Sequence, residues 1–278
     1  MRSARLAGVL LVLGLVVCSL VWAQEPVDLK LALPDGWQGS YQFEGNLTKV
    51  AMSGQDMGVG GTVQADLTAK LVATEAGTGI MTLELRFANI KANLGGQNMD
   101  QPDVGPLTMK VAPDGQLVAG DTQGNPDFFA AGPLPLHVLA APLLITRFKG
   151  EPVPVGGEWS FEDETEVPGL GKVKAKQTHT LDAVTDDQVT ITSNLEATIP
   201  EFTATLPFLQ NMQVKVTGGT LKVTDLQRHL ARQGCALLDT QGGVTVEVGL
   251  DLGGMATPVA TTMDVKLLPA KPEDTAGH

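Results

Sequence analysis

Apolar and polar residues alternate one by one along several stretches of this chain. Apolar side chains occupy every second position of residues 63–71 and 81–87, and the positions between them carry Gln, Asp, Thr, Lys, Glu or Arg. A period of two is typical of β-strands that bury one face. Residues 74–79 are turn-rich and join the two stretches, so the pattern predicts a β-hairpin.

The same alternation returns later and predicts further strands at residues 107–111, 173–181, 189–199, 244–248 and 263–267. Pro113-Asp114-Gly115 predicts a tight turn that ends the first of these strands, and Gly253-Gly254 separates the last two. The connections are too short for helical crossovers, so neighbouring strands are expected to run antiparallel. We therefore predict an all-β fold with minor α, built as a strongly curved antiparallel sheet or half-barrel.

Residues 127–148 depart from this pattern. The segment is strongly apolar, carries almost no charge before Arg147, and contains Pro133, Pro135 and Pro142. Proline inside a helix removes a hydrogen bond and clashes with the preceding turn, so a long helix is excluded. We expect one or two short helical turns, or a broken helix, packed on the sheet.

Two parts of the chain resemble copies of one meander. Residues 63–71 align with residues 173–181, and Trp37, upstream of the first of these segments, has a counterpart in Trp159, upstream of the second. Alternation alone also aligns any two hairpins, so duplication and coincidence are both open interpretations.

These patterns divide the chain into four parts. We expect a signal peptide over residues 1–23 and a first β-meander half over residues 24–150, which includes the apolar insert 127–148. A second half over residues 151–268 belongs to the same sheet or domain. Residues 269–278 are polar and are expected to form a disordered tail.

The first 23 residues have the layout of a cleavable secretory signal peptide. Arg2 and Arg5 precede an apolar run from Leu6 to Leu20, and the small residue Ala23 precedes Gln24. The run is shorter than the roughly 20 residues of a membrane span. We therefore expect a periplasmic or extracellular protein.

The two cysteines lead to different expectations. Leu15-Val16-Val17-Cys18 is similar to a lipobox, so anchoring through a lipidated Cys18 is the alternative to free secretion. That motif normally has Gly, Ala or Ser where Val17 stands, which favours free secretion. Cys235 is the one cysteine of the mature chain, cannot form an internal disulfide, and is expected to be buried.

The charge of the chain bears on its partners. The formal net charge is -12, and loss of Arg2 and Arg5 with the signal peptide lowers the basic residues from 19 to 17 against 31 acidic ones, which gives -14. So acidic a chain repels phosphate backbones and anionic lipid surfaces, and we expect no nucleic-acid partner. With 43% hydrophobic and 18% charged residues, the composition is that of a globular protein.

No motif indicates catalysis, and no enzymatic activity or cofactor is expected. The serines of the mature chain, at positions 40, 53, 160 and 193, lie outside any Gly-x-Ser-x-Gly elbow. The histidines, at positions 137, 179, 229 and 278, form no pair at metal-ligand spacing. The acidic stretches 121–127 and 162–166 offer oxygen ligands for calcium, but neither follows the EF-hand spacing, so no metal site is predicted.

The segment Pro152-Val153-Pro154-Val155-Gly156-Gly157-Glu158-Trp159, with the late turn from Gly234 to Gly243, resembles a group of uncharacterised secreted bacterial β proteins. In that group the segment reads Pro-x-x-Val-Gly-Asp-x-Trp, and Glu158 replaces the usual Asp. The group is similar in layout to the LolA-like lipoprotein carriers. This resemblance implies a curved antiparallel sheet around short helices, with an apolar concave face that takes acyl chains.

Two functional hypotheses follow. In the first, an exported envelope protein binds a lipid or other apolar ligand in the curved sheet, with Phe129, Leu136, Leu139 and Leu143 near the cavity; the alternative is that these residues are simply core. In the second, the protein is a structural or protein-interaction component of the cell envelope and meets an envelope protein.

Overall fold

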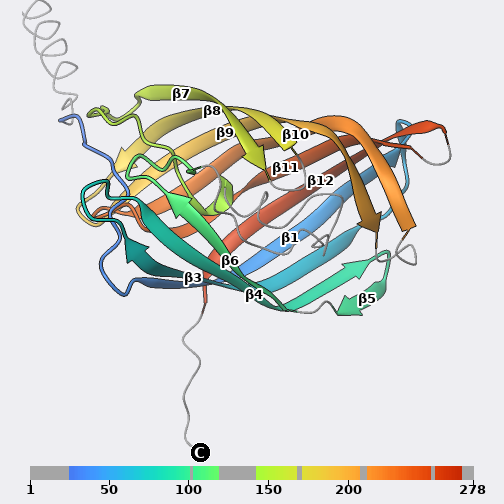
Figure 1. Cartoon of the computed structure of the whole chain (residues 1–278), viewed down its shortest axis with the longest axis horizontal. Coiled ribbons are helices and arrows are strands. Elements are labelled where there is room, and N and C mark those ends of the chain that lie inside the picture. The colour runs from blue at the N-terminus through green and yellow to red at the C-terminus, as the bar shows by residue number, and fades with distance from the viewer. Residues whose placement is uncertain are drawn as a thin grey trace, which may run out of the picture.

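The structure, a computed structural model, describes residues 25–100, 103–118, 142–167, 171–206, 212–251 and 254–270. In this part of the chain, twelve strands form one strongly curved antiparallel sheet (Figure 1). The two edges of the sheet are not paired with each other, so the sheet stays open. The predicted all-β fold is confirmed.

The strands are, in chain order, β1 (Gln38–Met52), β2 (Gln55–Asp56), β3 (Gly61–Thr74), β4 (Met81–Leu94), β5 (Gln97–Asp100), β6 (Val104–Val111), β7 (Glu158–Val167), β8 (Gly171–Val184), β9 (Gln188–Leu206), β10 (Met212–Ala231), β11 (Leu237–Asp251) and β12 (Ala256–Pro269). Their order in the sheet is β5-β4-β3-β1-β12-β11-β10-β9-β8-β7; in addition β2 pairs with β1 and β6 with β4. Because β12 pairs with β1, strands from the two ends of the chain lie side by side in the middle of the sheet.

The edges of the sheet are β7 on one side and β5 with β6 on the other. The chain passes from β6 to β7 through residues 112–157, so one connection joins the two edges. Both predicted halves contribute strands to this single sheet, and their duplication stays a prediction. Pro269 and Ala270, placed in the predicted tail, pair with β1, while residues 1–24 and 271–278 lie outside the described residues.

The alternation seen in the sequence produces the inner face of the sheet. The apolar residues of 63–71 and 81–87 are buried, whereas most polar residues between them keep contact with water. Burial of a large aliphatic side chain contributes about 1.5–3 kcal/mol, so the alternation selects which face turns inward. The inner face holds two apolar clusters, one at each end of the strands.

The connection between the edges packs on this inner face. A short helical turn at residues 142–144 lies within the curve of the sheet (Figure 1). Leu144 and Phe148 join the first apolar cluster, and Leu143 joins the second. The predicted short helical segment on the sheet is thus confirmed for its described part. Residues 119–141, with most of the predicted apolar insert, lie outside the described residues.

The N-terminal segment closes one end of the first cluster. Val27 pairs with Val153, and the backbone amide of Leu31 donates to the carbonyl of Pro113 at 2.8 Å. Leu29 and Leu31 are buried there. Cys235 is also buried and unpaired, as predicted, and its burial raises the pKa of its thiol.

Among the described residues, no helix is long and apolar enough to cross a membrane.

The turn after β6 lies in close contact with the connection between β6 and β7, and a substitution at Gly115 tests this contact. A Cβ on Gly115, whose φ is +80°, would lie 1.9 Å from the carbonyl oxygen of Thr146. We expect Gly115→Ala to destabilise the protein by about 3 kcal/mol or more, from backbone strain and overpacking together, in urea unfolding. Gly156, with φ +78° and open space around it, is the matched control, because Gly156→Ala adds about 1–2 kcal/mol of strain alone. Equal losses in the two variants would contradict this close contact.

Candidate functional site

A row of buried polar residues crosses the inner face of the sheet. His179 on β8, Ser193 on β9, Arg228 on β10 and Thr240 on β11 are each at most 3% exposed. Strand pairing sets His179 opposite Ser193 and Arg228 opposite Thr240. We call these four residues the polar belt. It separates the two apolar clusters, since Ile191 and Leu195, on either side of Ser193, pack with different clusters.

The polar belt is held together by hydrogen bonds through Ser193. The Arg228 guanidinium donates to Ser193 Oγ and to the backbone carbonyl of Pro142. Ser193 Oγ lies 2.8 Å from Nδ1 of His179. Because a guanidinium has only donors, Ser193 accepts from Arg228. The hydroxyl of Ser193 keeps a hydrogen and a second lone pair, so its contact with Nδ1 fits either tautomer of the neutral imidazole.

Two buried nitrogens of the polar belt have no hydrogen-bond partner. Nε of Arg228 and Nε2 of His179 are buried without a hydrogen-bond partner. Among the described residues, no carboxylate forms an ion pair with Arg228. Burial lowers the pKa of Arg228 to about 9, so the side chain still carries its charge at neutral pH. A buried charge without a counter-ion is costly to the folded state.

His179 stays neutral in this environment. Burial, with smaller repulsions from Arg228 and Arg147, lowers the pKa of His179 to about 3. Its ring stacks on Trp159 at a centroid distance of 5.3 Å, and the edge of Phe161 lies 6.3 Å away. Burial and the nearby cations thus favour the uncharged imidazole.

The His179–Ser193 contact has the residue types of a general base and a nucleophile, which the sequence spacing does not show. The arrangement is a weak one for that chemistry. An imidazole whose pKa is near 3 is a poor base at neutral pH, and the Arg228 donor occupies a lone pair of the hydroxyl oxygen. The hydroxyl instead links β8, β9 and β10 through its contacts with His179 and Arg228.

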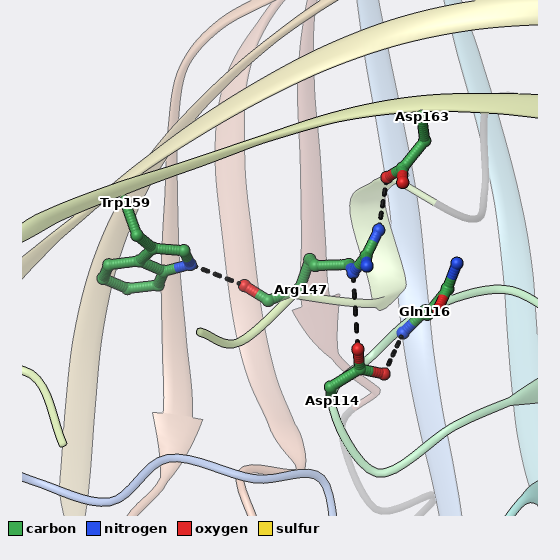
Figure 2. Close-up of polar contacts among 5 residues, drawn as sticks. All are labelled: Asp114, Gln116, Arg147, Trp159 and Asp163. Carbon is green, nitrogen blue, oxygen red and sulfur yellow. Dashed lines mark hydrogen bonds and ion pairs between the residues drawn. The ribbon is translucent and has the colours of Figure 1, made fainter. Parts of the chain in front are cut away.

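Arg147 lies beside the polar belt and joins the two edges of the sheet (Figure 2). Its guanidinium pairs with Asp163 on edge strand β7 and lies 3.6 Å from a carboxylate oxygen of Asp114, in the turn after β6. It also stacks on Phe161 at 4.2 Å. Its backbone carbonyl accepts a 2.9 Å hydrogen bond from the Trp159 indole. Arg147, unlike Arg228, is therefore compensated by acidic partners.

The acidic stretch 162–166, considered above for calcium, is divided between the faces of β7. Glu162 pairs with Lys176 and Glu164 with Lys172 on the outer face, whereas Asp163 turns inward to Arg147. These carboxylates do not converge on one point. Within the described residues, no group of three or more His, Cys, Asp or Glu side chains could hold a metal ion. The other acidic stretch, 121–127, lies outside the described residues.

The predicted ligand-binding residues are placed only in part. Leu143 is buried in the second apolar cluster. It follows Pro142, whose carbonyl accepts a hydrogen bond from Arg228 of the polar belt. Phe129, Leu136 and Leu139 lie outside the described residues.

A comparison with known protein families, curated proteins and solved structures finds no match for this chain. The LolA-like resemblance therefore stays a prediction.

The sequence analysis did not predict the polar belt, although the positions of its residues along the strands indicate that they are buried. His179, Ser193 and Arg228 stand in phase with the buried residues of their strands, two positions from Leu181, Ile191 and Leu230. A polar residue at such a position is a candidate for a buried functional group, because burial without partners costs free energy.

The state of His179 predicts an acid-sensitive fold. Its pKa is about 3 in the folded protein and about 6.5 when unfolded, so the unfolded state binds an extra proton between these values. Stability therefore falls as the pH drops from about 6.5 to 3, by about 4–5 kcal/mol in total from this group. We expect His179→Asn, which keeps an acceptor for Ser193, to abolish this pH-dependent part of the unfolding free energy. Unfolding in urea from pH 7.5 to 4 measures it.

Above pH 7.5 the difference in stability between wild type and His179→Asn should be constant, which serves as the internal control. A difference that stays the same down to pH 4 would show that the imidazole is not held neutral.

Proposed function

We propose that this protein is an exported protein of the cell envelope that binds a lipid or other apolar ligand on the inner face of its open sheet. The observation that carries the proposal is the second apolar cluster. Hydrophobic residues around it are half-buried rather than buried: Phe43, Val173, Ala175, Leu195, Phe202, Val246, Leu250, Val259 and Met263. A partly exposed apolar surface of this kind is typical of a ligand site.

The two ends of the interior differ in how well they are covered. Leu31, Leu144, Phe148 and Val153, from outside the strands, pack on the first cluster. A hollow lined by Leu31, Leu144 and neighbouring residues of this cluster is only about 20 Å³, close to the room for one water molecule. From the described part of the connection, Leu143 packs on the second cluster. The second end therefore offers the better place for a ligand.

The outer face of the sheet is less suited to an apolar ligand. Lys222 pairs with Glu196 and Lys215 with Glu201 across neighbouring strands. A groove of about 410 Å³ over β1, β3 and β4 is lined mainly by polar side chains. Charged and hydrated surfaces of this kind bind apolar molecules poorly, which favours the inner face.

The apolar site can be tested with a neutral fluorescent probe, N-phenyl-1-naphthylamine, on the purified mature protein. We expect binding, and we expect Leu250→Ser on the inner face to weaken it by about 1–2 kcal/mol, which is roughly five- to thirtyfold in Kd. Leu238→Ser is the matched control, because Leu238 lies on the same strand and is 38% exposed. Mass spectrometry of an organic extract should also find a co-purified lipid.

No probe binding together with no extracted lipid would overturn the proposal. Reproducible capture of one envelope protein would then favour the alternative, a structural or protein-interaction component of the envelope.

The proposed export rests on the sequence of residues 1–23 and has its own test. We expect the mature protein, expressed with its leader in a bacterium, to begin at Gln24 and to carry no lipid on its N-terminus. Intact-mass measurement decides this. A chain that begins at a lipidated Cys18 would show membrane anchoring, and a retained Met1 in the cytoplasm would overturn export.

A further inference from the structure

Arg228 is the feature of this interior that the apolar ligand does not explain. The side chain is buried among apolar residues, and among the described residues no carboxylate pairs with it. Replacing a buried charged group with a hydrophobic one of similar volume is often neutral or stabilising. A guanidinium kept at such a position therefore points to a partner that is absent from the free protein.

We infer that Arg228 binds the anionic head group of an amphiphilic ligand, whose apolar tail lies on the second cluster. This inference rests on the proposed function and specifies its ligand class: a single acyl or alkyl chain that ends in a carboxylate or a similar anion.

The position of Arg228 fits such a ligand. It lies at the boundary between the clusters, two residues from Leu226 in the second cluster. Ser193, which accepts from Arg228, is likewise two residues from Leu195, where the half-buried apolar surface begins. A head group at the polar belt would leave its tail directed along the strands toward Leu195 and the residues beyond it.

The free donors of the polar belt favour an acceptor rather than another donor. Nε of Arg228 carries a hydrogen and has no partner, and Nε2 of His179 is buried without a partner as well. A carboxylate can take two parallel hydrogen bonds from a guanidinium, and these are among the strongest in proteins. A cationic head group would meet Arg228 with the same charge, and an alcohol would leave that charge uncompensated.

One of the present partners of Arg228 can be exchanged without disturbing the sheet. Pro142, whose carbonyl accepts from the guanidinium, belongs to the connection and not to a strand. An anion can therefore displace that carbonyl while every strand pair stays in place. The other arginine of this region, Arg147, is partly buried and is already paired with Asp163 and Asp114, so it is not available in this way.

The test compares decanoic acid with decan-1-ol, two ligands with the same ten-carbon chain, by calorimetry at pH 7.5 and below micellar concentrations. We expect both to bind the wild-type protein, and the acid to bind at least about tenfold more tightly, because hydrogen bonds to charged groups are stronger than those to neutral ones. In Arg228→Met this preference should disappear, so that acid and alcohol bind with about equal affinity. The affinity for the alcohol should be the same as in the wild type.

Lys222→Met is the matched control, since Lys222 is a cation on the outer face of the same strand and should leave the preference unchanged. Arg228→Lys retains the charge and should keep part of the preference. Circular dichroism and cooperative unfolding confirm that each variant is folded. If Arg228→Met does not fold, the preference of the wild type and of Arg228→Lys still decides the question.

The outcomes separate the two proposals. Equal affinity of the wild type for acid and alcohol would overturn the role of Arg228 and leave the apolar site intact. A preference for the acid that persists in folded Arg228→Met would place the anion elsewhere and also overturn it. Failure of both ligands to bind would overturn the apolar site itself.

Discussion

The two edge strands of an open sheet must be protected from pairing with other chains. In this protein Arg147 contacts both edges. The backbone groups of an unpaired edge are a template for unwanted strand addition. Here Arg147 contacts Asp163 on β7 and Asp114 after β6, while the amide of Phe148 donates to the carbonyl of Asp114 at 2.7 Å. The guanidinium is only 12% exposed, so solvent screens these pairs less than it screens surface ion pairs.

The rest of the interior depends on this link. Because Arg147 holds the connection between the edges, Phe148 is inserted into the first cluster and Pro142 is brought to Arg228. The same connection therefore fills one end of the interior and supplies the Pro142 carbonyl that accepts from Arg228 at the polar belt.

The polar belt sets a boundary in an otherwise apolar interior. On one side the core is packed to near completion, and on the other the hydrophobic residues are half-buried. Arg228 and His179 each retain an unpartnered nitrogen at this boundary, against the general rule that buried polar groups are paired. Such exceptions are found preferentially at functional sites, where a ligand completes the hydrogen bonds.

The sequence determined which residues face inward, because burial repeats every second residue along a strand and the apolar pattern is visible without any partner strand. It also determined the hairpin of β3 and β4 and the burial of Cys235. It did not reveal β10, because bulges at Gly218 and near Asp225 interrupt the two-residue spacing of its buried apolar residues. The spacing breaks between Val216 and Leu221 and again between Val223 and Leu226.

Only the tertiary structure decided the polar belt and the contact of Arg147 with both edges. His179, Ser193 and Arg228 are distant in sequence and meet through the register of three strands, and Arg147 meets its carboxylates because the sheet curves until its edges approach. Register and curvature are properties of the whole sheet, and no local pattern encodes them.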